Sequence, residues 1–278
     1  MRILRTIFDF YINSSIHVAL AVYALSWLTL IQFNIAYDEN VLYFIFFASI
    51  TGYNFVKYFG LAKFHHRSLA NWLRVIQVFS LICFVVFCYY LFKLSLAALR
   101  CVIIFGMCTF LYAIPVIPKN VFLDKHKKLR SISGLKIYII AMVWAGVTVV
   151  LPLVNNDYDI YSNDVVVTVI QRFLLVIILM LPFEIRDLSY DSLRLATIPQ
   201  RIGIGRTKVV GVILSVVLFL LEYFKHNVSS KALISLLVVV LITILFLLFA
   251  RTEQRKYYSS FWVESIPLYW LALLLMLS

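Results

Sequence analysis

Two aspartates spaced four residues apart are the residues best suited to chemistry in this 278-residue chain. On a helix, this spacing places Asp187 and Asp191 on one face, with Cβ atoms about 6 Å apart. Two carboxylates this close repel each other unless a cation lies between them, and Mg²⁺ is a hard cation that prefers oxygen ligands. Because Mg²⁺ binds readily where substrate phosphates complete its coordination, the pair predicts a site for a phosphate-bearing substrate.

Arginines close to the two aspartates extend the predicted site. Arg194 and Arg201 are suited to binding a diphosphate, because a guanidinium offers forked donors to phosphate oxygens. The alternative interpretation is that these charges are solvated at a membrane surface and pair with one another. The segment 197–203, with the sequence TIPQRIG, is typical of a helix stop followed by the start of a new helix.

The elements that position this site must lie in a lipid bilayer. Hydrophobic residues make up 63% of the chain and charged residues 14%, whereas soluble domains are roughly 45–50% apolar and about 25% charged. A single core of ordinary size cannot bury this much apolar surface. We therefore predict a multi-pass integral membrane protein, and we attribute the net charge of +12 to basic cytoplasmic loops rather than to nucleic-acid binding.

Nine segments are long and apolar enough to cross the hydrocarbon layer as helices, which takes about 20 residues each. They predict an all-α bundle that forms a single domain over residues 1–278, with spans at 12–36, 41–60, 75–93, 98–118, 136–154, 164–183, 208–224, 232–250 and 261–278. Basic residues gather in alternate connections, which places the N-terminus in the cytoplasm. A bacterial inner membrane fits this pattern, and so does an internal eukaryotic membrane.

The sixth and the ninth predicted spans each carry an internal charge. Arg172 in the sixth span lies about 22 Å from Asp187 along an ideal helix, so we expect it to reach the membrane surface or to pair with an external acid. Glu264 lies near the cytoplasmic end of the ninth span. We expect a structural role for it, in contact with Arg251 or Arg255, and the alternative is that it lines the active cavity.

The stretch from Asp187 to Gly203 resembles the second aspartate motif of the UbiA-type intramembrane prenyltransferases, D-x-x-x-D followed by T-[LI]-P-x-x-x-G. Members of this family have nine helices and a diphosphate site at the connections after the second and sixth helices. The resemblance implies Mg²⁺-dependent transfer of an isoprenyl group from a prenyl diphosphate to an aromatic or lipid acceptor. It also implies that Asp187 and Asp191 hold the metal and act in catalysis, while Arg194 and Arg201 bind the diphosphate.

The family's first motif, N-x-x-x-D-x-x-x-D, is degenerate at the end of the second span. Asn54 is present, but Tyr58 and Ala62 stand at the two acidic positions. The resemblance implies that Asn54 contacts the diphosphate, and we expect Lys57 to supply part of the positive charge of the missing metal. The alternative is a catalytically inactive protein of this fold that binds a lipid or a partner. A transporter is disfavoured, because the polar residues gather at the span ends rather than in mid-membrane.

Overall fold

The computed structural model describes residues 2–58, 67–113, 135–189 and 197–277, and all regular structure within these ranges is helical. The helices are α1 (Arg2–Asn13), α2 (Ile16–Gln32), α3 (Glu39–Tyr58), α4 (Arg67–Leu91), α5 (Leu96–Ala113), α6 (Leu135–Ala145), α7 (Leu151–Asn155), α8 (Asn163–Asp187), α9 (Ile198–Ile202), α10 (Ile204–Leu220), α11 (Ser230–Phe249) and α12 (Ile266–Leu277). π-Helical turns at Gly146–Val150 and Tyr258–Val263 precede α7 and α12. The all-helical prediction is confirmed for these residues, and helices suit lipid because they satisfy their own backbone hydrogen bonds.

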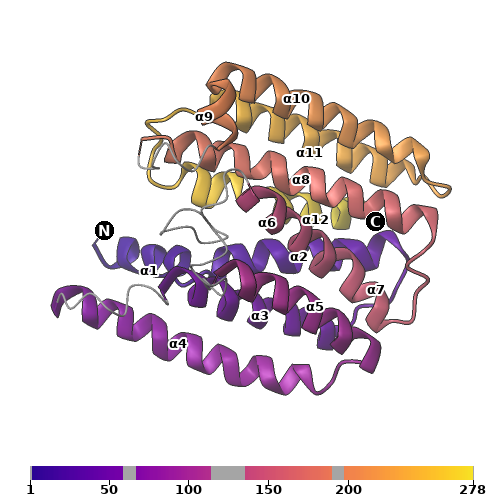
Figure 1. Cartoon of the computed structure of the whole chain (residues 1–278). Coiled ribbons are helices and arrows are strands. Elements are labelled where there is room, and N and C mark those ends of the chain that lie inside the picture. The colour runs from indigo at the N-terminus through magenta and orange to yellow at the C-terminus, as the bar shows by residue number, and fades with distance from the viewer. Residues whose placement is uncertain (1, 59–66, 114–134, 190–196, 278) are drawn as a thin grey trace, which may run out of the picture.

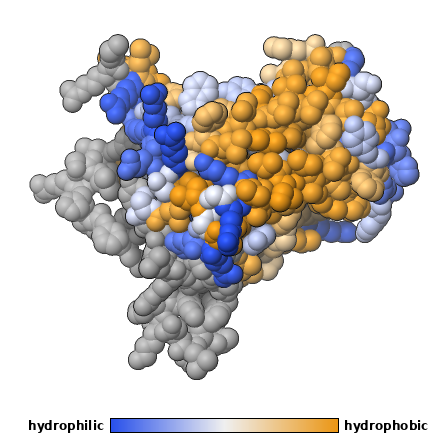
Figure 2. Space-filling model, turned by 90° about the horizontal axis from the view of Figure 1, so that it is seen from above, coloured by the Kyte–Doolittle hydropathy of each residue, from blue (hydrophilic) through white to orange (hydrophobic). Residues whose placement is uncertain are grey.

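Six helical segments of the described residues are long and apolar enough to cross a bilayer, or seven if the bent pair of α1 and α2 counts as one span. The six are Leu73–Leu91, Leu135–Asn155, Asn163–Asp187, Ile204–Phe224, Ser230–Phe249 and Tyr258–Leu277. Figure 2, which looks onto the side of α10 and α11, shows a broad apolar area between polar residues at its two ends. Multi-pass membrane character is therefore confirmed, and α3 and α5 occupy the places of the predicted second and fourth spans.

The long helices lie side by side, with α8 near the centre of the molecule (Figure 1). α8 packs against α6, α10 and α11, while α2 packs against α3 and α12. α10 and α11 form one edge in Figure 1, and α4 forms the opposite edge. Inside the protein, 67% of the apolar window of α8 is buried, compared with 11% of that of α4. Protein therefore surrounds most of α8, whereas α4 leaves most of its apolar surface for lipid.

The apolar core is built around α8 and α2. The larger cluster combines Leu175, Ile178 and Leu181 of α8 with residues of α2, α6, α10, α11 and α12. A second cluster joins α2 to α3, α5 and α7, with Leu30 and Leu42 among its buried members. Because α2 contributes to both clusters, it connects the half of the bundle around α8 to the half that ends in α4.

The predicted first span is broken near its start. Ser15 has a φ of 64°, and the axes of α1 and α2 differ by 54°. A residue other than glycine adopts this left-handed conformation infrequently, and here side chains of α3 hold it. Ser15 Oγ donates to Asn54 Oδ1 (2.8 Å), and Asn54 Nδ2 donates to the carbonyl of Ser14 (2.9 Å). The expectation of one uninterrupted span over residues 12–36 is therefore wrong at its beginning.

Gly211 of α10 lies where three helices approach closely. A Cβ atom here would meet Leu181 Cδ1 of α8 at 2.8 Å, and it would also clash with Leu247 of α11. Gly211→Leu should push α10 away from both neighbours and lower the free energy of unfolding by about 1–3 kcal/mol. Gly106→Leu is the matched control, because no atom lies within 4 Å of a Cβ at that position. Thermal unfolding in detergent measures the effect, and equal midpoints for the two variants would contradict the close packing.

Candidate functional site

A cavity of about 500 Å³ opens at the end of the bundle where α8 terminates. Its walls come from α1, α3, α6 and α8, together with the chain from Lys256 into α12. We call it the Asp187 cavity and define it by the charged residues in its lining, which are Asp9, Lys57, Lys136, Arg186, Asp187, Lys256 and Glu264. The ends of the predicted second and sixth spans, far apart in the sequence, therefore lie at one site.

One wall of the Asp187 cavity is apolar and leads away from the charged mouth into the bundle. Phe183, Leu179 and Val176 of α8 line it at helical spacing. Trp144 of α6 lies in the same lining, and its Nε1 donates to Tyr53 Oη at 2.6 Å. Charged groups at one end and apolar side chains at the other make this cavity suited to an amphiphile with an ionic head and a hydrocarbon chain.

The mouth of the cavity carries more positive than negative charge, because four of its charged lining residues are basic and three are acidic. Lys256 forms an ion pair with Asp9, and this hydrogen bond raises the pKa of Lys256 above its ordinary value. Asp9 also accepts a hydrogen bond from Tyr257 Oη at 2.7 Å. The charge of Asp9 is thus compensated within the protein, and the excess of positive charge attracts an anion.

Asp187 is the last residue of α8 and lies at the cavity mouth. Its Oδ1 accepts a hydrogen bond from Arg186 Nε at 2.8 Å, and the Arg186 guanidinium lies 5.2 Å from the centroid of the Phe183 ring. The two charged side chains keep 32% and 27% of their surface exposed, so a ligand can reach both. Asp191 and Arg194 fall outside the described residues, and their part in the site stays a prediction.

Asp187 is suited to Mg²⁺ as one of a small number of protein ligands. Within the described ranges, no three or more His, Cys, Asp or Glu side chains come together to form a metal site. Mg²⁺ usually keeps several waters and uses one or two carboxylates together with substrate phosphates. Asp187, the predicted Asp191 and a diphosphate would supply such a set, and the ion would neutralise negative charge on the diphosphate.

Asn54 and Lys57 lie one turn apart on α3 but have different surroundings. Asn54 is 3% exposed, and its Nδ2 also donates to Ser80 Oγ at 2.8 Å, in addition to its bonds at the α1–α2 break. Lys57 lines the Asp187 cavity, and its Nζ donates to Ser15 Oγ at 2.8 Å. The structure therefore brings Lys57 together with Asp187. Contact of Asn54 with a diphosphate stays a prediction that would require its present bonds to break.

Tyr58, at the first acidic position of the degenerate motif, also contacts the start of the chain. Its Oη donates to the carbonyl of Asn13 at 2.9 Å. Together with Asn54 and Lys57, it supports the α1–α2 break from the last turns of α3. Tyr58, Asn54 and Lys57 thus hold a backbone bend next to the cavity.

The TIPQRIG segment forms the helix stop and restart that its sequence predicts. The N–H of Thr197 donates to Gln200 Oε1 at 3.1 Å, and Pro199 lies in the first turn of α9. Gly203, with a φ of +81°, separates α9 from α10 in a conformation that glycine adopts without steric cost. Arg201 is exposed on α9 and lies outside the lining of the Asp187 cavity, so its contact with a diphosphate stays a prediction.

Glu264 lies in the Asp187 cavity, the location that the sequence offered only as an alternative. The cations that interact with its carboxylate are Lys57 and Arg186. Ion pairs with Arg251 or Arg255 are absent among the described residues. The π-helical turn Tyr258–Val263 lies between those arginines and Glu264 in the sequence.

Arg172 lies deep in α8, away from the Asp187 cavity. It is 2% exposed, its Nη2 donates to Thr29 Oγ1 at 3.2 Å, and its guanidinium lies 5.4 Å from the centroid of the Trp270 ring. Among the described residues it has no acidic partner within ion-pair distance. The expectation that it reaches the surface or pairs with an acid is therefore wrong, and the Trp270 face takes the place of an acid.

Three residues of the charged lining, Asp9, Lys136 and Lys256, are not among the site residues that the sequence predicts. The available signal was their position, because all three lie at the basic ends of predicted spans. That signal predicts on which side of the membrane a residue lies. Which residues of that side line the cavity depends on how α1, α6 and the chain before α12 pack together.

No family model, curated protein or solved structure matches the chain. The motif from Asp187 to Gly203 and the geometry of the Asp187 cavity are therefore the observations that bear on function. The two share Asp187, but the motif concerns residue types along α8 and α9, whereas the cavity also depends on α1, α3, α6 and α12.

Replacing Asn54 should weaken the α1–α2 break. Asn54→Ala removes the donor to Ser14 and the acceptor for Ser15, and it should lower the free energy of unfolding by about 1–3 kcal/mol. Asn227→Ala, at an exposed asparagine on the connection after α10, is the control and should leave stability unchanged. Thermal unfolding in detergent is the measurement. Unchanged stability in Asn54→Ala, with loss of ligand binding alone, would show instead that this amide serves a ligand.

Proposed function

We propose that the chain is a membrane prenyltransferase-like enzyme that moves an isoprenyl group from a prenyl diphosphate to a hydrophobic acceptor, aromatic or lipid. One observation carries the proposal. Lys57 at the end of α3 and Arg186 with Asp187 at the end of α8 line the same cavity, which continues as an apolar wall. A site at these two connections is what the resemblance to UbiA-type prenyltransferases implies.

The diphosphate fits the charged mouth of the Asp187 cavity. Lys57 approaches it from α3, Lys136 from α6 and Arg186 from α8. Three cations from three helices can surround one diphosphate and stabilise the charge that develops on it as it leaves. Mg²⁺ held by Asp187 and the predicted Asp191 would supply further neutralisation at the same oxygens.

The isoprenyl chain fits along the apolar wall formed by α6 and α8. Cleavage of the bond between the allylic carbon and the diphosphate oxygen leaves an allylic cation, which water would capture. Phe183 and Trp144 line the cavity between its mouth and its depth, and aromatic faces stabilise cations. The acceptor loses a proton when its new bond forms, and Glu264 is the carboxylate placed in the same lining to receive it.

We infer a nine-span topology in which α3 and α5 cross the membrane in addition to the long apolar helices. α3 has 20 residues and α5 has 18, close to the length that a span requires. The basic connections would then share the cytoplasmic side with the N-terminus. The Asp187 cavity would open to the cytoplasm of a bacterium, or to the corresponding side of an internal membrane, where soluble diphosphates are available.

A catalytically inactive lipid-binding or partner-binding protein is the second candidate, and two observations favour it. Tyr58 stands at an acidic position of the first motif and donates a hydrogen bond to the backbone carbonyl of Asn13. Asp187 already pairs with Arg186, so a metal must compete with this contact. Binding without turnover would distinguish this candidate from the enzyme.

Farnesyl diphosphate should stabilise the purified protein in detergent, and Mg²⁺ should increase the effect, because a ligand that binds only the folded state raises the melting temperature. Lys57→Met should weaken binding roughly tenfold or more, since it removes a charge that contacts the diphosphate. Lys93→Met changes an exposed lysine outside the cavity and should bind as the wild type does. Thermal shift titrations give the affinities.

Asp187→Asn should abolish the dependence on Mg²⁺ while leaving part of the Mg²⁺-independent binding. Asp159→Asn, at an exposed aspartate on the connection before α8, is the matched control. Failure of farnesyl diphosphate and of a longer prenyl diphosphate to stabilise folded wild-type protein under any condition would reject the proposed function. Stabilisation without release of diphosphate in the presence of candidate acceptors would favour the inactive protein.

A further inference from the structure

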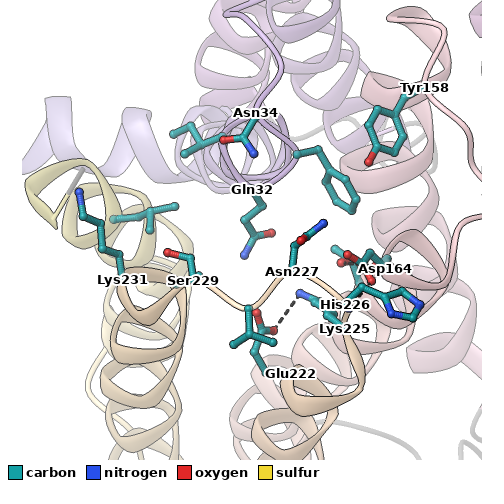
Figure 3. Close-up of a pocket in the computed structure, with 16 residues that line it drawn as sticks. Gln32, Asn34, Tyr158, Asp164, Glu222, Lys225, His226, Asn227, Ser229 and Lys231 are labelled. Atoms are coloured by element: carbon teal, nitrogen blue, oxygen red, sulfur yellow. Dashed lines mark hydrogen bonds and ion pairs between the residues drawn. The ribbon is translucent and has the colours of Figure 1, made fainter.

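A second cavity, of about 580 Å³, lies at the other end of α8. The end of α2, the start of α8, the connection between α10 and α11 and the last turns of α12 form it (Figure 3). We call it the Lys225 cavity and define it by Gln32, Asp164, Glu222, Lys225, His226 and Lys231. Asp164 lies at the first turn of α8 and Asp187 at the last, so the two cavities occupy opposite ends of the bundle.

A buried ion pair forms the floor of the Lys225 cavity. Lys225 Nζ and Glu222 Oε2 are 2.8 Å apart, and their side chains are 7% and 4% exposed. Gln171 of α8 also donates to Glu222 Oε2 at 2.9 Å. Burial lowers the pKa of Lys225, and the Glu222 carboxylate opposes this effect. A buried pair contributes little to stability by itself because desolvation offsets its attraction, so its presence beside a cavity favours a ligand role.

Lys231 and Asp164 lie on opposite sides of this cavity, and the Lys225–Glu222 pair lies between them (Figure 3). In Figure 3, Lys231 and Ser229 are on one side, Asp164 and His226 are on the other, and Gln32 projects between them. The Asp164 carboxylate accepts a hydrogen bond from the backbone N–H of His226 at 2.8 Å, which fixes its place at the rim. A ligand that carries both a positive and a negative group would match this separation.

Gln32 favours a ligand that can donate a hydrogen bond. Its Oε1 is buried and has no hydrogen-bond partner in the described part of the chain. A buried acceptor without a partner costs about 1–3 kcal/mol, and a ligand that carries an N–H group would remove that cost. The side chain projects into the cavity (Figure 3), so a ligand there lies on the side from which a donor can approach.

The apolar part of the lining indicates where such a ligand comes from. Ile31 of α2, Ala232 of α11 and Leu274 of α12 lie in the lining next to the polar groups. These helices belong to the apolar body of the protein, and helices that span a bilayer have their ends at the level of lipid head groups. A phospholipid can place its head group among the charges and its chains along the apolar helices.

We propose that the Lys225 cavity binds the head group of a phosphoethanolamine lipid. The ammonium lies toward Asp164 and Glu222 and donates to Gln32 Oε1, while the phosphate lies toward Lys231. Phosphocholine has the same two charges but no N–H group, so it cannot satisfy Gln32. This assignment does not depend on the function proposed for the Asp187 cavity, because no residue lines both cavities.

Native mass spectrometry of the purified full chain tests the assignment with an equimolar mixture of phosphatidylethanolamine and phosphatidylcholine that have identical acyl chains. We expect roughly tenfold preference for the ethanolamine lipid, the size of one hydrogen bond to a charged group. Gln32→Leu should reduce this preference to about twofold or less. Gln77→Leu makes the same change at an exposed position of α4 and should keep the full preference.

Asp164→Asn provides a second variant, because it removes the rim charge without removing Gln32, and it too should reduce the preference. Equal binding of the two lipids by wild-type protein would overturn the proposal. A preference that survives in both Gln32→Leu and Asp164→Asn would place the lipid elsewhere on the protein. Water-soluble glycerophosphoethanolamine is the remaining arm, and competition by it at the affinity of the lipid would overturn the membrane source of the ligand.

Discussion

The cost of placing a charge in hydrocarbon governs where this protein can have polar sites. An isolated charge at the bilayer centre costs at least about 2.5 kcal/mol, so the lipid-facing helices α10 and α11 present apolar side chains along their length. α8 avoids this restriction because other helices surround it. It can therefore carry Arg172 at depth against Trp270, and it places Asp164 and Asp187 at its two ends, each in a cavity.

The Asp187 cavity also depends on the bend between α1 and α2, which lies far from α8 in the sequence. α1 lies at 54° to α2 and contributes Asp9 and Asn13 to the cavity lining. The last turns of α3 hold the bend, and Lys57 belongs to both features because it donates to Ser15 and also lines the cavity. Lys57 therefore both supports the bend between the first two helices and contributes charge to the site.

Sequence reasoning reached the helical class, the membrane character and the restart at Gly203 because each follows from local patterns of composition and turn chemistry. The break at Ser15 was missed, since no proline or glycine marks it and its stabilising partner, Asn54, lies on another helix. Glu264 was misplaced for a similar reason. Which cation an intramembrane acid meets depends on how helices pack, and neighbours along the chain do not reveal it.

The length of α8 has a consequence for how the protein meets bilayers of different thickness. Its 25 residues extend about 37 Å, whereas a hydrocarbon layer is about 30 Å thick. The apolar spans that lipid contacts are shorter, with 20 residues in α11 and 19 in the span Leu73–Leu91 of α4, and they match the layer with little tilt. The excess length of α8 therefore lies at the centre of the protein rather than at the perimeter that lipid contacts. Moderate thinning or thickening of the membrane would be absorbed at the perimeter, while the spacing between the two charged ends stays fixed.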